Sequence, residues 1–333
     1  MERRLTTARL RHGLAVEILC VTAPDAHWRE AILAFLAHKP PEWLTPLRLA
    51  LAGALPDLPT HFYLAVTPAG QIITNVTLVE AGAPPVGLLQ HVYTHPDHRQ
   101  QGAARAVLTA ATADFDARGG VLLTLSTGYQ TPPYFLYQQV GFIGRGTTGA
   151  MVRGRTPDAE AQLFTPGPTT VRPVAWGDFP GCVALHLVEG GWTVRSVAFG
   201  VHGPRSFEGA FVRLMDGLSG GGAWPVRAQA ARVLVTRPGA VVGLATLCQT
   251  PHWREALLLD LFVHPAFQDQ APALLAALPL PADSKLQAFA EPEATEKTTA
   301  LLRQGFVPEG LLRAQVRVEG TWRDVLVLGR WPR

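Results

Sequence analysis

Two segments of the chain resemble each other at a distance of 169 residues. Residues 88–106 read LLQHVYTHPDHRQQGAARA and residues 257–275 read LLLDLFVHPAFQDQAPALL, so that His95 matches His264 and each is followed by proline. A repeat of this length indicates a duplicated domain, because the repeating units of a solenoid are far shorter. The chain is therefore expected to fold into two similar domains.

The repeat extends in both directions along the chain. Gly70 matches Gly239 at the same offset, and Gly141 matches Gly305 at an offset of 164, with phenylalanine following each of the latter two. A turn-forming Pro-Gly-Pro stretch at 166–168 lies between the copies. We expect a first domain over residues 1–165 and a second over 168–333, which suits a chain of 333 residues.

The composition is that of a globular protein, with 47% hydrophobic and 17% charged residues. The formal net charge of +3 is too balanced to predict nucleic acid or an anionic membrane as the main partner. The three cysteines are too few and too far apart for a disulfide framework or a zinc ribbon. We find neither a signal peptide nor an apolar run of membrane-spanning length, and we expect a cytoplasmic protein.

Hydrophobic periodicity predicts alternating strands and helices in each copy. In the first copy, strands are expected at 14–21, 61–66, 71–79, 86–93 and 121–126, then two more, with helices at 25–37 (Asp25 as a possible N-cap), 47–55, 103–118 and 133–139. In the second copy, strands are expected at 171–174, in a hairpin around Gly239, and at 256–263, 286–290, 311–318 and 325–328, with helices at 177–187, 207–218, 272–278 and 295–304. The fold class is therefore α/β, with a mixed sheet in each domain.

The segment from Val92 to Ala104 runs from a strand through a loop into a helix. The first turn of a helix has unpaired N–H groups at its positive end, and these bind phosphate oxygens. Gly102 and the small residues after it leave room for a pyrophosphate to approach the backbone, and Arg99 can add a side-chain donor. Taken alone, the pattern fits an ordinary strand–loop–helix connection equally well.

The same segment resembles the acyl-CoA signature of the GNAT superfamily of N-acetyltransferases, (Arg or Gln)-x-x-Gly-x-(Gly or Ala). Arg99, Gly102 and Ala104 occupy its three defining positions. Residues 136–142, LYQQVGF, are similar to a second family element, Leu-Tyr-x-x-x-Gly-Phe. The resemblance covers about residues 12–155, with a faded copy over 168–330, and implies two tandem GNAT-like acyl-CoA N-acyltransferase domains.

The resemblance implies acetyl-CoA as the co-substrate and a sheet in which two neighbouring parallel strands splay apart. Here these strands would be 86–93 and 121–126, with the pantetheine arm in the gap between them. The implied cofactor-binding residues are Val92, Tyr93, Thr94, Arg99, Gln100, Gln101, Gly102, Ala103 and Ala104.

Two catalytic candidates follow. The family tyrosine that protonates the departing CoA thiolate corresponds to Tyr137, for which the alternative is a core aromatic residue. Many family members carry a glutamate base at the position where this chain has Gln90 and His91. Because a histidine titrates near neutrality, His91 is the candidate base. The alternative is that His91 is a packed histidine without a catalytic role. The asparagine usual before the Leu-Tyr helix is absent, and the sequence TGYQ stands at 127–130 instead. The pattern of Gly128 with Pro132 and Pro133 indicates a distinct substrate loop.

We predict no metal site. His91, His95 and His98 lie close together, but a helical metal motif needs its histidines one turn apart, and Pro96 interrupts any such helix.

The second copy has lost the phosphate-binding pattern. Arg99, Gly102 and Ala103 correspond to Gln268, Ala271 and Pro272, and proline has no N–H to donate. Tyr137 corresponds to Leu301 and His91 to Asp260, for which a structural role is expected. We therefore expect the second domain to bind no cofactor.

The sequence predicts an acetyl-CoA-dependent N-acetyltransferase in which an amine attacks directly within a ternary complex. The acceptor would be a small-molecule or protein amine, with neither nucleic acid nor membrane as a partner, and the chain would be a monomer or a homodimer. The alternative is a non-catalytic protein that binds or senses acyl-CoA.

Overall fold

The computed structural model describes residues 1–221, 225–250 and 253–332. These residues form two compact units. The first comprises Met1–Gly144 with Met151–Glu160, and the second comprises Arg145–Ala150 with the chain from Ala161 onward. Within the described ranges, no helix is both long enough and apolar enough to cross a bilayer.

The first unit is built on a mixed sheet with the strand order β1-β2-β3-β4-β5-β6-β8-β7. Neighbouring strands from β1 to β5 are antiparallel, whereas β5 and β6 are parallel. The strands are β1 (Glu2–Arg9), β2 (Ala15–Thr22), β3 (Thr60–Val66), β4 (Ile72–Ala81), β5 (Val86–Thr94), β6 (Leu122–Ser126), β7 (Ile143–Arg145) and β8 (Ala150–Gly154).

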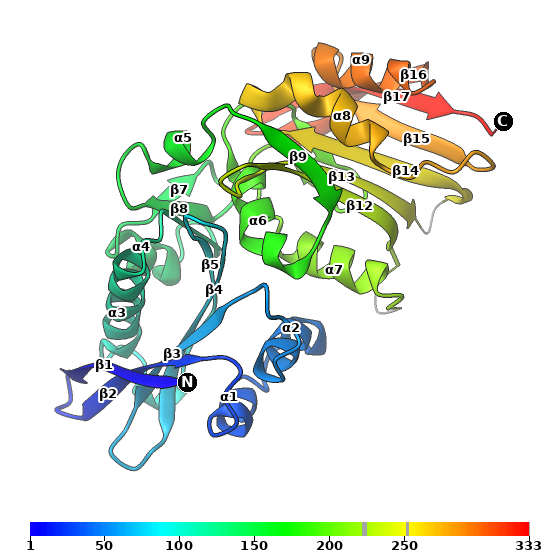
Figure 1. Ribbon diagram of the computed structural model, residues 1–333. Coiled ribbons are helices and arrows are strands. Elements are labelled where there is room, and N and C mark those ends of the chain that lie inside the picture. Colours follow the sequence, from blue (N-terminus) through cyan, green and yellow to red (C-terminus); the bar gives the residue numbers. More distant parts are fainter. Residues whose placement is uncertain (222–224, 251–252, 333) are drawn as a thin grey trace. The chain divides into compact units, whose positions relative to one another are not determined.

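Helices cover both faces of this sheet (Figure 1). They are α1 (Arg29–Phe35), α2 (Pro41–Leu51), α3 (Ala103–Ala117) and α4 (Pro132–Gln138), followed by the short α5 (Ala159–Leu163). Because successive side chains of a strand point to opposite faces, Tyr63 of β3 packs in the core under α3, while Phe62 and Leu64 pack under α1 and α2. Burial on both faces explains why β3 reads as an almost continuous apolar run.

The parallel strands β5 and β6 separate along their length. They pair at Val86–Leu122, Gly87–Leu123 and Leu88–Thr124, after which no further pair joins them, although β5 continues to Thr94. The expected splay between these two strands is thus confirmed.

The second unit contains a seven-stranded sheet with the order β16-β17-β15-β14-β13-β12-β9. Position by position, this order corresponds to β7-β8-β6-β5-β4-β3-β2 of the first sheet. The parallel pair β14–β15 occupies the place of the parallel pair β5–β6. The strands are β9 (Thr169–Pro173), β12 (Arg227–Thr236), β13 (Val241–Thr250), β14 (Trp253–Val263), β15 (Lys285–Ala290), β16 (Val307–Val318) and β17 (Thr321–Arg330).

Helices also cover both faces of the second sheet: α6 and α7 lie on one face, and α8 and α9 lie on the other (Figure 1). A small hairpin of two short strands, β10 and β11, precedes α7. The bounds are α6 (Phe179–Leu187), β10 (Val194–Ser196), β11 (Val201–His202), α7 (Glu208–Leu218), α8 (Ala271–Ala276) and α9 (Thr295–Arg303).

Most sequence-predicted elements are confirmed within a few residues. Strand β1 and the β10–β11 hairpin were not predicted, and α2 starts earlier than expected, at Pro41. Helix α1 starts at Arg29 rather than near Asp25, because the Asp25 carboxylate accepts the N–H groups of His27 and Trp28 and so forms a turn ahead of the helix.

Candidate active site

A bulge interrupts β5 soon after it parts from β6. The register with β4 shifts between the pairs Asn75–Tyr93 and Thr77–Gln90, and His91 adopts a φ of +49°. The amide of the buried Asn75 donates to the carbonyl of His91 at 2.9 Å, which holds this unusual conformation for a non-glycine residue. Since a bulge bends and twists its strand, it redirects β5 where the gap between the two parallel strands opens.

The loop from β5 to α3 is held in place by a hydrogen bond to β4, by bonds within its own backbone and by one glutamine side chain. The His95 N–H donates to the Ile73 carbonyl, and the short 3₁₀ helix η1 (Pro96–His98) follows. The Gln101 side chain then donates to the carbonyl of Asp97 at 3.1 Å. These hydrogen bonds therefore fix the shape of the loop without a ligand.

The amino terminus of α3 presents unused donors. Gly102 is its N-cap, with a φ of +93°, and the first N–H bonded within the helix is that of Ala106, which donates to Gly102. In the described chain, no backbone carbonyl accepts from the N–H groups of residues 103–105. These free donors, together with the positive end of a helix that runs to Ala117, form an anion-binding arrangement.

Glycine is required at 102 by conformation rather than by space. A Cβ atom built there would meet nothing within 4 Å, whereas the left-handed φ is costly for any other residue. The open space in front of this residue is where a pyrophosphate would approach the backbone.

The exposed Arg99 side chain lies beside the end of β5. Its Nε donates to the carbonyl of Thr94 at 3.2 Å, and its guanidinium lies 5.9 Å from the centre of the Tyr93 ring. A pantetheine amide that paired with the Thr94 carbonyl would share that acceptor with Arg99.

Sequence reasoning did not find His38, which follows α1. Its ring lies 3.9 Å from the ring of Tyr93, which also contacts Phe35. No local pattern could have revealed this contact, because it depends on how the end of α1 packs against β5. Burial, together with the nearby charges of Lys39 and Arg99, lowers the pKa of His38.

His91, the candidate base, lies on the bulge. Burial, followed by the charges of Lys39 and His38, lowers the pKa of its imidazole to about 4. The ring is therefore neutral at pH 7 and able to accept a proton, although its low pKa gives it little driving force as a base.

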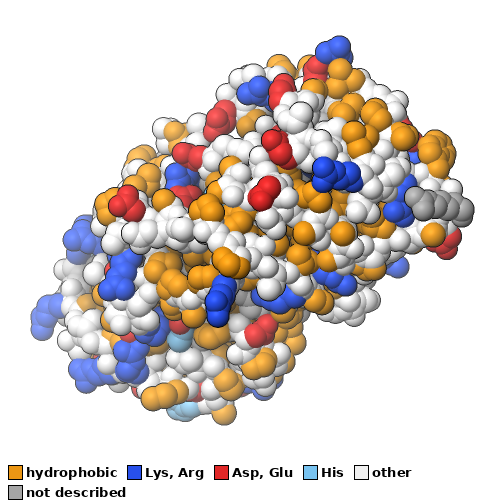
Figure 2. All heavy atoms as spheres, turned by 45° about the horizontal axis from the view of Figure 1, so that its top comes forward, with side chains coloured by type: hydrophobic (Ala, Val, Ile, Leu, Met, Phe, Trp, Pro, Cys, Tyr) orange, Lys and Arg blue, Asp and Glu red, His pale blue; other side chains and the backbone are white. Residues whose placement is uncertain are grey.

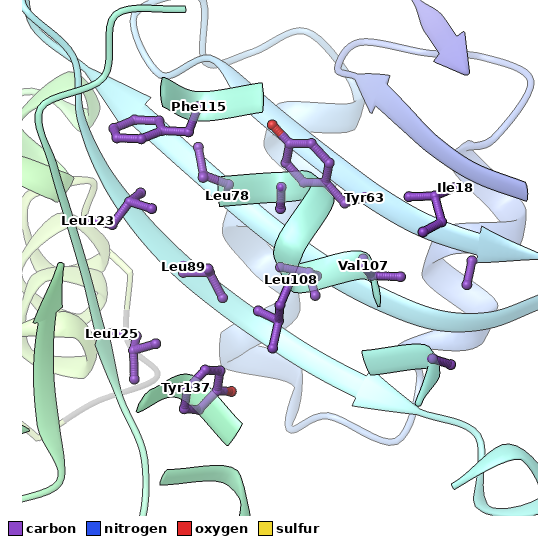
Figure 3. Packing of buried hydrophobic residues seen from close by; sticks show 14 of the residues in the cluster. Ile18, Tyr63, Leu78, Leu89, Val107, Leu108, Phe115, Leu123, Leu125 and Tyr137 are labelled. Atoms are coloured by element: carbon purple, nitrogen blue, oxygen red, sulfur yellow. The ribbon is translucent and has the colours of Figure 1, made fainter. Parts of the chain in front are cut away.

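Tyr137, the candidate acid, lies on α4 with 7% of its surface exposed. It shares a core cluster with Leu89 and Leu125, which are the first residues beyond the last β5–β6 pair (Figure 3). Its ring is thus a core aromatic, and its position is beside the start of the gap between the strands.

In the ranges that the structure describes, no group of three or more His, Cys, Asp or Glu side chains is arranged to hold a metal ion. The rings of His95 and His98 are 6.1 Å apart. The cysteines, Cys20, Cys182 and Cys248, are buried and unpaired.

Residues 59–143 match the family model described as "Acetyltransferase (GNAT) domain". The match includes the splayed strands, the loop from β5 to α3, and Tyr137. The first half of the chain therefore contains a GNAT acetyltransferase domain. No curated protein shows significant sequence similarity to the chain.

Several solved structures resemble half of the chain at low identity. One is a GNAT superfamily phosphinothricin acetyltransferase from Sinorhizobium meliloti in complex with acetyl-CoA, with 19% identity, a TM-score of 0.39 and coverage of 49% of this chain and 87% of that one. Another is a ribosomal-protein-alanine N-acetyltransferase from Brucella melitensis, with 19% identity, a TM-score of 0.37 and coverage of 49% and 99%. At these values the likenesses identify neither an acceptor nor a mechanism.

Proposed function

We propose that the first unit binds acetyl-CoA and transfers its acetyl group to an amine. The pyrophosphate would lie on the free N–H groups at the start of α3, and the pantetheine arm would lie where β5 and β6 part. The observation that carries this proposal is the combination of a splayed parallel pair with an open helix terminus at its end, within a GNAT domain.

The proposed roles follow from the positions of the side chains. Tyr137, beside the start of the gap, gives a proton to the CoA thiolate as it leaves. His91, neutral at pH 7, accepts the amine proton through water. The amine attacks the thioester directly while both substrates are bound.

One observation favours the alternative of acyl-CoA binding without transfer. The sequence of β5 contains no carboxylate, and the pKa of His91 is about 4, so the strand offers no strong base. Under this alternative the domain reports the presence of acyl-CoA.

Thiol release measured with acetyl-CoA and a panel of amines distinguishes the two functions. An N-acetyltransferase releases CoA with at least one acceptor, and mass spectrometry then identifies an acetylated product. A protein that binds acetyl-CoA in calorimetry but releases no thiol with a metabolite extract or with protein amines would refute transfer.

We further propose that the second unit is a GNAT-like fold whose cofactor gap is closed by its own chain. The shared strand order supports the first part of this proposal. For the second part, the last β14–β15 pair is Leu259–Ala288, and the gap that would follow lies between Asp260 on β14 and Glu291 after β15.

Residues 193–198 bridge these two carboxylates. The Asp260 carboxylate accepts from the N–H groups of Val197 and Ala198, at 2.8 and 2.9 Å, and from the Ser196 hydroxyl. The Glu291 carboxylate accepts from the N–H groups at residues 193 and 194. A segment bonded both to β14 and to the residue that follows β15 supports the proposal that no pantetheine arm enters here.

A buried lysine adds to this closure. Lys297 of α9 is 2% exposed, and its ammonium donates to the carbonyl of Val194 at 2.7 Å. These contacts satisfy buried charged groups that would otherwise be costly. The hydrogen bonds of the Asp260 carboxylate to residues 196–198 support a structural role for it.

A further inference from the structure

A groove with a volume of about 800 Å³ lies between β1 and α3 in the first unit. One wall is β1 with its following turn, from Leu5 to Arg11, and the other is the side of α3 that carries Arg105, Ala106 and Ala110. Neither residues 92–94 nor Tyr137 line it, so the groove is separate from the proposed thioester site.

The groove follows an open strand edge. Within the described ranges, β1 pairs with β2 on one side and with no strand on the other. Residues 5–9 of β1 all line the groove although their side chains alternate between the two faces, and Ile18 of β2 lines it as well. The groove therefore lies over the α3 side of the hairpin and reaches the open edge of β1, whose N–H and C=O groups that face away from β2 are a template for a further strand.

The charge of the groove is basic. Arg9 and Arg105 line it, are exposed, and make no ion pair with any described residue, while the Arg11 guanidinium contacts only the carbonyl of Gln100. The acid that lines the groove, Asp114, is already paired with Arg3 and Arg118. Basic side chains also gather at the left end of the face in Figure 2, the end at which Figure 1 draws the β1–β2 hairpin.

We propose that this groove binds an extended acidic peptide segment, which adds to β1 as a further strand. Main-chain hydrogen bonds to the strand edge would supply affinity, and Arg9, Arg11 and Arg105 would select for acidic side chains. The strand residues 5–9 span roughly 13 Å, and the helix wall from 102 to 113 spans roughly 17 Å, so about five peptide residues fit.

A second copy of this chain does not suit the groove. In a two-fold antiparallel pairing of β1 with itself, centred near Thr6, Arg3 or Arg4 would lie opposite Arg9 of the other copy. Like charges directly opposite each other destabilise a strand pair. The charge of the edge thus favours an acidic partner.

The groove also contacts the phosphate-binding loop. The Arg11 N–H donates to the carbonyl of Gln101 at 3.1 Å, and both Gln101 and Gly102 line the groove. A bound segment would therefore lie against the loop that we assign to acetyl-CoA.

The probe is a hexapeptide of alternating valine and glutamate, with fluorescein coupled to its amino terminus and an amidated carboxyl terminus, so that it carries no acceptor amine. We expect its fluorescence anisotropy to rise with the full chain, and the matching valine–lysine peptide to give no signal. Arg9→Glu combined with Arg105→Glu should weaken the glutamate peptide at least about tenfold and create binding of the lysine peptide. Arg29→Glu, an exposed charge reversal on α1, is the control and should change neither.

Ala110→Trp provides a second variant, because its side chain fills the groove and should block the glutamate peptide, with folding checked by circular dichroism. Equal binding of both peptides, or unchanged affinity in the charge-reversed and Ala110→Trp variants, would overturn the proposal. So would a concentration-dependent dimer that Ala110→Trp abolishes, since it would show a second copy in the groove.

Discussion

Gly102 is the residue on which the proposed cofactor site depends most directly. The space around it is open, so a substituted side chain would meet the ligand rather than the protein. We predict that Gly102→Glu abolishes acetyl-CoA binding, because its carboxylate would lie against the pyrophosphate and its φ would be strained. Calorimetric titration with acetyl-CoA measures the loss of binding.

The matched control is Gly119→Glu at the other end of α3. Gly119 has a φ of +87° and equally open surroundings, so it carries the same conformational cost away from the phosphate-binding loop. If Gly102→Glu binds acetyl-CoA as the wild type does, the loop is not the cofactor site.

Tyr137 tests the chemical step separately from binding. We predict that Tyr137→Phe lowers kcat about a hundredfold and leaves acetyl-CoA affinity unchanged, because the phenyl ring keeps the core contacts while the proton donor is lost. Tyr134→Phe on the same helix is the control, since that hydroxyl packs closely against Gly144. An unchanged kcat in Tyr137→Phe would remove the residue from the mechanism.

At the residue scale, the sequence reveals what depends on short spacing. Arg99, Gly102 and Ala104 are recognisable because three positions in one loop carry the pattern. The positive φ of His91 was not predictable, since it depends on a hydrogen bond from Asn75 across the sheet. The contact of His38 with Tyr93 likewise joins residues far apart in the chain.

At the scale of elements, one ionic cluster ties the carboxyl end of α3 to the sheet. Arg118, the C-cap of α3, forms an ion pair with Glu80 of β4 at 2.8 Å, and Glu80 also lies 3.2 Å from His61 of β3. Burial alone would raise the pKa of Glu80, but the hydrogen bonds from His61 and Arg118 outweigh it and lower the pKa to about 2.

A carboxyl with a lowered pKa stabilises the fold when ionised. This stabilisation is present above pH 4.5 and is lost as the pH falls toward 2. We predict that Glu80→Gln lowers the free energy of unfolding by about 2 kcal/mol at pH 7, allowing for partial solvent screening, and that the difference from wild type shrinks between about pH 5 and 2.

Denaturant unfolding at several pH values measures this difference. Glu17→Gln is the control: Glu17 pairs with Arg4 at the surface, so its loss should cost less than about 1 kcal/mol. A difference between Glu80→Gln and wild type that stayed constant down to pH 2 would contradict the role assigned to the carboxylate.

Each element that the sequence did not predict has its own physical reason. Strand β1 reads ERRLTTAR and is almost entirely exposed, so it lacks the apolar alternation by which a strand is recognised. The hairpin β10–β11 is very short and is fixed by Asp260 of β14 and by Glu291, which follows β15, and both residues are distant in the chain. Buried strands such as β3 and β6 were predicted because their own side chains determine their position.

At the scale of the whole molecule, the two copies differ where a cofactor would bind. The first sheet carries a bulge at His91, whereas β13 and β14 pair without interruption from Gly243–Val263 to Gln249–Leu257. The matching position in the second sheet, Asp260, lies opposite Thr246 in this regular register. The regular register at Asp260 and the bridging segment 193–198 both support the proposal that the second sheet admits no cofactor.

This difference predicts one acetyl-CoA per chain. The first copy offers Gly102 and free N–H groups at its helix start, while the second has Pro272 at the second position of α8, where no N–H exists, and residues 193–198 across the gap. Calorimetry should therefore give a stoichiometry of one, and Gly102→Glu should remove all of the binding heat. A stoichiometry of two, or a site of full affinity that survives in Gly102→Glu, would show that the second unit also binds the cofactor and that the segment bridging Asp260 and Glu291 moves aside to admit it.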